Sequence, residues 1–169
     1  MRIQGSKALI TGASSGVGAA LAQAMAQAGG QVLLLARRRA ELEKVAASLQ
    51  RANDPKIFPV DLTDANAVEN VAAAITAQVG TPDILINNAG AGAWKFLDET
   101  SPEEAVQMMA VPYFAAVFVT RAFLPAMLRR HSGHIVNVSS VGSRFVWPGA
   151  TGYLAARWAV RGLTEALRA

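Results

Sequence analysis

The stretch KALITGASSGVG, residues 7–18, constrains the fold more than any other part of the sequence. An apolar run leads into Thr11 and Gly12, and an alanine-rich segment at helical spacing follows Gly18. This order predicts a strand, a tight turn and a helix, the arrangement by which α/β proteins hold a phosphate at a helix N-terminus. The spacing is G-x-x-x-G-x-G rather than the commoner G-x-G-x-x-G, so a turn without a ligand stays an alternative on this motif alone.

Three glycines and three hydroxyl side chains give this turn its predicted chemistry. Gly12 allows the sharp exit from the strand, Gly16 lets backbone approach a pyrophosphate, and Gly18 lets the helix pack on the sheet. The hydroxyls that add to the free N–H groups at the helix start are those of Thr11, Ser14 and Ser15. The residues expected to bind a cofactor here are Gly12, Ser14, Ser15, Gly16, Val17 and Gly18.

At 169 residues, the chain is expected to form a single domain over residues 1–169 with a sizeable core. Hydrophobic residues make up 52% and charged residues 17%, which excludes a disordered chain and favours strands buried on both faces. The absence of cysteine excludes disulfides and thiolate metal sites and suits a reducing cytoplasm, and we predict no metal centre. The start of the chain lacks the apolar run of a secretory signal. We expect no membrane span, because Pro112 interrupts the apolar residues 108–119 and that stretch is short.

The formal net charge of +4 at pH 7 raises the question of a nucleic-acid partner. The basic residues fall into separate short groups, such as residues 37–39 and 129–130, and they do not alternate with stacking aromatics. A nucleic-acid interface needs a continuous basic stripe. We therefore expect no nucleic-acid partner.

Strand and helix patterns alternate along the whole chain, without a repeat or a linker. Apolar runs predict strands at residues 8–10, 32–35, 56–60, 83–87 and 133–139. Helical spacing and capping signals predict helices at residues 17–28 and 41–51, from Thr63 as cap to 79, from Ser101 to about Arg130, and at 151–167. Right-handed crossovers then give an α/β fold, a doubly wound parallel sheet with helices on both faces. Ligands of such sheets lie outside the carboxyl ends of the strands.

Arginines follow the second predicted strand, which ends at Ala36. A carboxylate at this point would hold the ribose 2′-hydroxyl of NAD, whereas the guanidinium groups of Arg37 and Arg38 suit the 2′-phosphate of NADP. Arginine at a helix start opposes the helix dipole, which favours an anion there over a merely solvated helix start. We therefore predict that NADP(H) is preferred over NAD(H).

Two further strand ends carry residues suited to the rest of a dinucleotide. Asp61 follows the third strand and could accept a hydrogen bond from an adenine amino group, or serve only as a loop or cap carboxylate. Leu62 stands beside it. Asn88, Ala89 and Gly90 follow the fourth strand, where small residues would let a cofactor lie against the backbone.

TGASSGVG, NNAG, the serine pair 139–140 and Tyr153 together resemble the motifs of the short-chain dehydrogenase/reductases, in order and with the family's spacing. The resemblance runs from about Lys7 to the last residue. It implies a Rossmann-type sheet and hydride transfer between NAD(P)H and a carbonyl or alcohol. By the same resemblance, Ser140 hydrogen-bonds the substrate oxygen and Tyr153 passes a proton to or from it, because hydride addition builds an alkoxide that must be protonated.

Two positions depart from the family's pattern. Arg157 stands where the family has a lysine, one helical turn after Tyr153; it keeps the positive charge and reach to the cofactor ribose, but its planar fork differs from an ammonium. Pro112 stands where the family has an asparagine that holds a relay water, in a helix that is locally irregular in the family. These departures leave two hypotheses: an NADP-preferring oxidoreductase, or a catalytically impaired dinucleotide-binding or partner-binding protein.

The third departure is the C-terminus. Family members continue with two more strands, so we expect strands one to five here and the family's last two absent, a C-terminally incomplete domain. The fifth strand, expected to be buried on both faces, would then be an apolar sheet edge that a second copy or another chain covers, and we predict a homo-oligomer.

Four aromatic residues of the loops after the fourth and fifth strands stand where substrate should enter: Trp94, Phe96, Phe145 and Trp147. They favour an apolar carbonyl or alcohol as the small-molecule substrate, with packing of the core or of a lid as the alternative. The two histidines, His131 and His134, are expected to be structural.

Overall fold

The computed structural model describes residues 2–49 and 54–168. One parallel sheet has the strand order β3-β2-β1-β4-β5. Its strands are β1 (Lys7–Thr11), β2 (Gln31–Ala36), β3 (Lys56–Pro59), β4 (Ile84–Asn87) and β5 (His134–Asn137). The order reverses between β1 and β4, so a crevice is expected where the chain leaves their carboxyl ends in opposite directions. The predicted α/β fold is confirmed.

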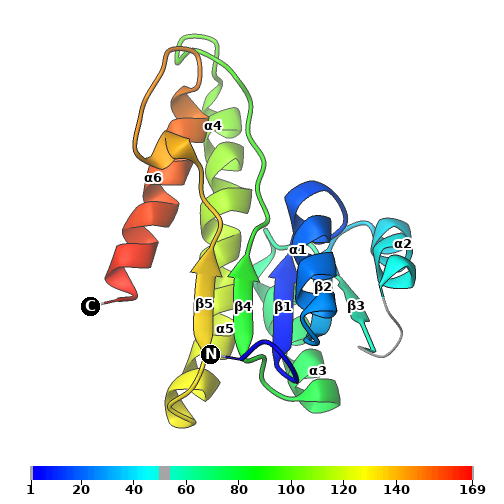
Figure 1. Cartoon of the computed structure of the whole chain (residues 1–169). Helices are drawn as coiled ribbons and strands as arrows, with labels where there is room; N and C mark the ends of the chain where they lie inside the picture. Colours follow the sequence, from blue (N-terminus) through cyan, green and yellow to red (C-terminus); the bar gives the residue numbers. More distant parts are fainter. Residues whose placement is uncertain (1, 50–53, 169) are drawn as a thin grey trace.

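Helices cover both faces of the sheet. They are α1 (Gly16–Gln27), α2 (Arg39–Ser48), α3 (Ala65–Val79), α4 (Pro102–Met109), α5 (Ala115–Arg129) and α6 (Thr151–Ala166). In Figure 1, α1 and α2 lie in front of the strands, and α3 and α5 lie behind them. Alternate residues of β1 point to opposite faces of the sheet. Ala8 and Ile10 pack with Ala22 of α1 on one face, and Leu9 packs with Val119 of α5 on the other. The inner strands are therefore buried on both faces, as their composition predicts.

The helix predicted from Ser101 to Arg130 is divided by a π-helical turn. The capping box at Ser101 is present, with its hydroxyl accepting from the backbone N–H of Glu104. Between α4 and α5, residues Ala110–Phe114 form the π-helix η2, which contains the buried Pro112. Because proline has no N–H and its ring collides with the carbonyl four residues earlier, a regular α-helix is disfavoured there, and the wider turn accommodates the ring.

The stretch Pro102–Arg129 remains one continuous helical rod, as the prediction of a long helix from Ser101 to about Arg130 requires, and Pro112 does not interrupt it. By length and composition alone it is the one helix of the described residues that could cross a membrane. Its residues Ala115, Val119 and Phe123 are buried against the sheet. Core helices of α/β folds share this apolar composition, so the rod is explained by its place in the fold.

Local signals misplaced some helix boundaries. The N-cap of α3 is Asp64 and not Thr63, since the Asp64 carboxylate accepts from the backbone N–H groups of Asn66 (2.9 Å) and Ala67 (3.1 Å). Helix α2 begins at Arg39 and ends at Ser48, and the predicted end at Arg51 lies outside the described residues.

Strand β5 differs from its predicted burial. His134 and Val136 are exposed, and Ile135 and Asn137 are half-buried. Within the described ranges, β5 pairs only with β4 and no strand lies on its outer side. Burial on both faces was therefore wrong for this strand, while its position at the sheet edge was predicted correctly.

Candidate functional site

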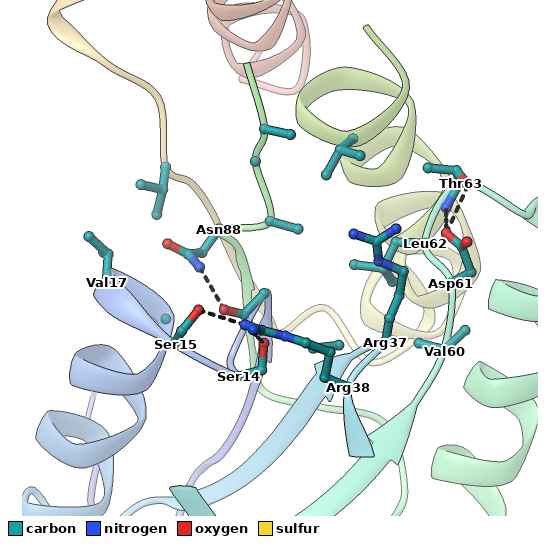
Figure 2. Close-up of a pocket in the computed structure, with 18 of the residues that line it drawn as sticks. Ser14, Ser15, Val17, Arg37, Arg38, Val60, Asp61, Leu62, Thr63 and Asn88 are labelled. Carbon is teal, nitrogen blue, oxygen red and sulfur yellow. Dashed lines mark hydrogen bonds between the residues drawn. The ribbon is translucent and has the colours of Figure 1, made fainter. Parts of the chain in front are cut away.

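A cavity of about 450 Å³ opens at the carboxyl ends of the strands, at the reversal of strand order (Figure 2). Thirteen of the predicted site residues line it: Gly12, Ser14, Ser15, Val17, Gly18, Arg37, Arg38, Asp61, Leu62, Asn88, Ala89, Gly90 and Arg157. Gly16, Ser140 and Tyr153 are not among the lining residues. Four separate strand ends thus bring nearly the whole predicted set to one place.

The glycine-rich turn has the shape of a backbone cradle. Gly12 has φ +66°, and a Cβ built there would lie 2.9 Å from the Cα of Ala89. A Cβ at Gly18 would overlap the carbonyl oxygen of Gly12, so this position must be bare for α1 to approach the strand. Gly16 has φ +54° and open space beside it. Since the α1 N-cap, Ser15, makes no side-chain hydrogen bond to the helix, the first-turn N–H groups are available to an anion.

Thr11 has a structural task that differs from the predicted one. Its side chain is buried, and its Oγ1 accepts hydrogen bonds from the backbone N–H groups of Asn88 and Ala89, each at 3.0 Å. In return, the Asn88 side-chain amide donates to the Thr11 carbonyl at 2.9 Å. The Thr11 hydroxyl therefore faces β4 instead of the cavity, and it fixes one wall of the site relative to the turn.

The two arginines after β2 reach the cavity from the same edge. Arg38 donates through Nη2 to the hydroxyls of Ser14 (3.1 Å) and Ser15 (3.0 Å), which holds its guanidinium over the glycine-rich turn (Figure 2). Arg37 lines the cavity beside Leu62. By contrast, Arg39 lies outside the cavity and pairs with Glu43 on α2. Two of the three consecutive arginines thus present positive charge to a ligand.

Asp61 is an ionised carboxylate at the far side of the same cavity. Its Oδ1 accepts from the backbone N–H of Thr63 (3.0 Å) and from the Thr63 hydroxyl (2.8 Å). These two hydrogen bonds lower the pKa of Asp61, and the charge of Arg37 lowers it further. The local loop contact that the sequence left as an alternative is therefore present. Both bonds end on one oxygen, which leaves the other oxygen to meet a ligand.

Helix α6 carries Tyr153 and Arg157 on successive turns. The guanidinium carbon of Arg157 lies 5.0 Å from the centroid of the Tyr153 ring, a cation–π arrangement. Arg157 Nη1 donates to the Val138 carbonyl at 3.3 Å, and its buried Nε has no hydrogen-bond partner among the described residues. The positive charge at position 157 therefore lies against the face of the phenol ring and against the strand end.

Ser140 caps the short 3₁₀ helix η3 (Val141–Ser143), and its Oγ accepts from the backbone N–H of Gly142 at 3.1 Å. Because a hydroxyl also has a proton to donate, this arrangement leaves that proton for a substrate oxygen. The preceding Ser139 lines the cavity and donates to the Arg157 carbonyl at 3.2 Å. The serine pair thus contacts α6 through one member and caps the loop through the other.

Two of the four predicted aromatic residues, Trp94 and Trp147, form a stack beside Tyr153. Trp94 stacks on the Tyr153 ring with centroids 5.8 Å apart and on Trp147 at 5.6 Å. Trp94, Phe96 and Phe145 are exposed. The loops after β4 and β5 therefore bring an apolar, solvent-facing surface next to the phenol.

Sequence reasoning missed several residues of the cavity wall: Ala36, Val60, Thr63, Ala91, Val111, Val138 and Ser139. Most of them stand at or just after a strand end, and the rule that ligands lie there could have found them. Val111 offered no such signal, because it lies in the π-helix η2 and not at a strand end.

The strand order, the crevice at its reversal and the glycine-rich turn define a Rossmann-like α/β protein. The family described as short chain dehydrogenase matches residues 6–169. The chain therefore belongs to the short-chain dehydrogenase/reductase family, as the four motifs predict.

Relatives and solved structures agree with this assignment. The chain is 38% identical to the Drosophila melanogaster dehydrogenase/reductase SDR family protein 7-like, over 99% of its own length and 53% of that protein's. It superposes with a TM-score of 0.91 on a short-chain dehydrogenase/reductase of Burkholderia phymatum in complex with NAD, at 32% identity, covering 99% of this chain and 60% of the other. It also superposes on a metagenomic short-chain oxidoreductase in complex with NADP, with a TM-score of 0.89 and 32% identity, covering 99% of this chain and 76% of the other. The chain spans about half the length of the curated relatives it matches.

Proposed function

We propose that this chain forms the cofactor-binding part of an oxidoreductase that moves a hydride between NADP(H) and an apolar carbonyl or alcohol. The observation that carries the proposal is the single cavity that joins the glycine-rich turn, two arginines and Arg157 beside Tyr153. Nicotinamide, when bound, supplies or takes up the hydride. All other steps belong to residues of the chain.

The cavity suits the adenine half of the dinucleotide. The bare turn at Gly16 and the N-terminus of α1 would hold the pyrophosphate, since a phosphate needs close backbone and free N–H groups. Arg37 and Arg38 would hold the 2′-phosphate through charge-assisted bonds. Asp61 would accept from the adenine amino group through the oxygen that Thr63 does not occupy.

For the reaction itself, three side chains have distinct roles. Ser140 donates a hydrogen bond to the substrate oxygen, keeping its own proton, and so polarises the carbonyl. Tyr153 gives its phenolic proton to that oxygen as the alkoxide forms, and takes it back in the direction of oxidation. Arg157 stabilises the negative charge that the phenol then carries and holds the cofactor ribose.

The cofactor preference is tested by calorimetric titration of the purified chain with NADPH and NADH. Because a charge-assisted hydrogen bond contributes roughly 1.5–3 kcal/mol, NADPH should bind about ten- to a hundredfold more tightly. Arg37→Asp should abolish the difference, because a carboxylate repels the 2′-phosphate of NADPH and can accept a hydrogen bond from the 2′-hydroxyl of NADH. Arg39→Asp is the matched control, since this neighbouring arginine lies outside the cavity. Equal affinities of the unmodified chain for the two cofactors would refute the preference.

The geometry of Arg157 favours a second candidate, a dinucleotide-binding or partner-binding protein with impaired catalysis. Its guanidinium is occupied by the Tyr153 ring and the Val138 carbonyl, and a guanidinium cannot pass on a proton as an ammonium can. At position 112, proline replaces the family's asparagine, whose backbone holds a relay water, and its ring and missing N–H alter the backbone there. On this basis we expect NADPH binding with little NADPH-dependent reduction of apolar ketones or aldehydes. Arg157→Lys combined with Pro112→Asn should raise the rate. Brisk turnover by the unmodified chain would exclude the impaired candidate.

For its setting, we propose a cytoplasmic homo-oligomer without a nucleic-acid or membrane partner. A chain without cysteine suits a reducing compartment. Exposed apolar residues on the helical rod and on α6, Val106, Phe114 and Trp158, supply a surface for a second copy. Light scattering at several protein concentrations tests this, and a monomer throughout would contradict it.

A further inference from the structure

The segment after β4, residues 90–95, runs along the first turns of α6 in the opposite direction. A side chain at Gly90 would meet Arg157, and one at Gly92 would meet Tyr153. Trp94 stacks on Tyr153, and the Lys95 carbonyl accepts from the backbone N–H of Thr151 at 3.4 Å. Every second residue of the segment, at 90, 92 and 94, therefore contacts one of the two side chains that α6 presents to the site.

Gly92 leaves room for the Tyr153 ring. A Cβ built at Gly92 would overlap Cδ2 of the ring and lie 3.3 Å from Cε2. The backbone of Gly92 is not in the left-handed region, so the ring, rather than the main chain, requires a glycine here. A tyrosine ring is rigid and cannot bend away from such a contact; it has to rotate or move as a whole.

Helix α6 is itself packed closely on α4. A Cβ at Gly152 would overlap Sδ of Met108, so the first turn of α6 lies against the Met108 side chain. Trp94 occupies a further position beside the ring by stacking on it. With the helix and the indole in place, the free space at Gly92 fixes where the ring lies.

Gly90 has the corresponding relation to Arg157. A Cβ there would lie 2.7 Å from Nη2 and 3.4 Å from Nη1 of the guanidinium. These atoms are the far end of a flexible side chain, so Arg157 would shift with little loss of stability. Gly90 and Gly92, two residues apart in the extended segment, thus face Arg157 and Tyr153, four residues apart on α6.

We propose that residues 90–95 position the reacting groups: Gly92 fixes the Tyr153 ring, Gly90 fixes the Arg157 guanidinium, and Trp94 covers the phenol on the substrate side. The catalytic part of this inference rests on the proposed oxidoreductase function. Gly92, Gly90 and Trp94 are positioning residues that act through Tyr153 and Arg157.

Fluorine NMR tests the placement of the ring without any turnover. The chain has two tyrosines, so a protein labelled with 3-fluorotyrosine gives a Tyr153 resonance that Tyr153→Phe identifies by its loss. Gly92→Ala should shift the Tyr153 resonance and leave that of Tyr113 in place. Gly162→Ala, on the same helix with open space at its Cβ, is the control and should move neither. An unchanged Tyr153 resonance in Gly92→Ala overturns the proposal.

A stability cycle keeps the test decisive if Gly92→Ala folds poorly. Urea unfolding compares Gly92→Ala in the unmodified chain with the same change in a Tyr153→Ala background. If the ring is the obstacle, the loss of stability caused by Gly92→Ala disappears once the ring is gone. An equal loss in both backgrounds would mean that Gly92 acts through another contact, and the proposal would fail.

The kinetic effects separate the two glycines. Since a displacement of about 1 Å at a reacting group costs up to roughly a hundredfold in rate, Gly92→Ala should lower kcat about ten- to a hundredfold with little change in the KM for NADPH. Gly90→Ala should instead raise the KM for NADPH. The reverse pattern would contradict the assignment. Absence of any turnover, with the NMR shift and the stability cycle as expected, would favour the candidate with impaired catalysis and leave the positioning of the ring established.

Discussion

Replacing Thr11 by valine removes one hydroxyl that joins the glycine-rich turn to the end of β4. The Thr11 Oγ1 accepts two backbone hydrogen bonds, from Asn88 and Ala89, both at 3.0 Å, within a side chain that is 2% exposed. Its own donation to the Ile86 carbonyl is long, at 3.4 Å, and contributes little. Valine has nearly the same shape and is favoured in strands, so Thr11→Val creates no cavity and no strain.

The expected cost follows from the two N–H groups that lose their acceptor. A buried donor left without a partner costs about 1–3 kcal/mol. Asn88 and Ala89 are half-buried, so the lower half of that range, about 1–2 kcal/mol, applies to each, and Thr11→Val should lower the free energy of unfolding by about 2–4 kcal/mol. The same residues line the cavity, so the affinity for NADPH should fall as well.

Urea unfolding and calorimetric titration with NADPH measure the two effects. Thr76→Val is the matched control, because Thr76 is exposed on α3 and its hydroxyl donates only to the Ala72 carbonyl of the same helix. This variant should change the free energy of unfolding by no more than about 0.5 kcal/mol. If Thr11→Val unfolds within that margin of the unmodified chain, the hydroxyl does not hold the two loops together, and the reasoning from its buried hydrogen bonds is refuted.

Three further expectations concern other parts of the chain. The pKa of the Asp61 carboxyl, followed by NMR, should lie below its ordinary value of 3.8, and Thr63→Val should raise it. The stabilisation that the hydrogen bonds of Asp61 give to the fold is complete above pH 3.8 and is lost as the pH falls through the native pKa. Asp64→Ala should destabilise the chain by about 0.5–2 kcal/mol in urea unfolding, because two N–H groups of α3 lose their cap, whereas Thr63→Ala should cost less. In hydrogen exchange, the amides of β5 should exchange at least about tenfold faster than those of β1 unless another copy covers the edge, and equal protection in a sample that is monomeric by light scattering would contradict this.

The sheet and the cavity could be predicted because their signals are local and repeat along the chain. Strands buried on both faces contain uninterrupted apolar runs, such as residues 8–10 in β1 and residues 32–36 in β2, and each is followed by a turn and an amphipathic segment. Once parallel strands are assigned, their carboxyl ends must meet at one edge. Residues as distant in sequence as Ser14, Arg37, Asp61 and Asn88 were therefore expected together, and they line one cavity.

Features that depend on tertiary contacts could not be predicted in the same way. The hydroxyls of Thr11, Ser14 and Ser15 look equivalent in the sequence. Of the three, Thr11 accepts hydrogen bonds from the backbone N–H groups of Asn88 and Ala89, which directly follow β4. Whether Thr63 or Asp64 caps α3 depends on which side chain faces the first-turn N–H groups. The guanidinium of Arg157 lies over the Tyr153 ring because Gly90 leaves space for it, which spacing along α6 alone does not reveal.

The two prolines of the rod from Pro102 to Arg129 lie in different backbone geometries. Pro125 lies inside the regular helix α5, on its exposed side. Pro112 lies buried in η2, where the N–H of Ala115 bonds to the carbonyl of Ala110, five residues back. A proline inside a regular α-helix costs about 3 kcal/mol through the missing hydrogen bond and the steric clash with the carbonyl four residues earlier. In η2 the wider turn has already moved that carbonyl away.

Replacing each proline by alanine should therefore change the stability in opposite directions. Pro125→Ala restores a helical hydrogen bond, and after the greater freedom of the unfolded chain is subtracted it should stabilise the protein by about 1–2 kcal/mol. Pro112→Ala gains no such bond and removes buried ring atoms, so it should destabilise by about 1 kcal/mol. Urea unfolding of the two variants decides. If both stabilise equally, η2 does not accommodate its proline, and Val111 lines the cavity at the expense of a strained helix.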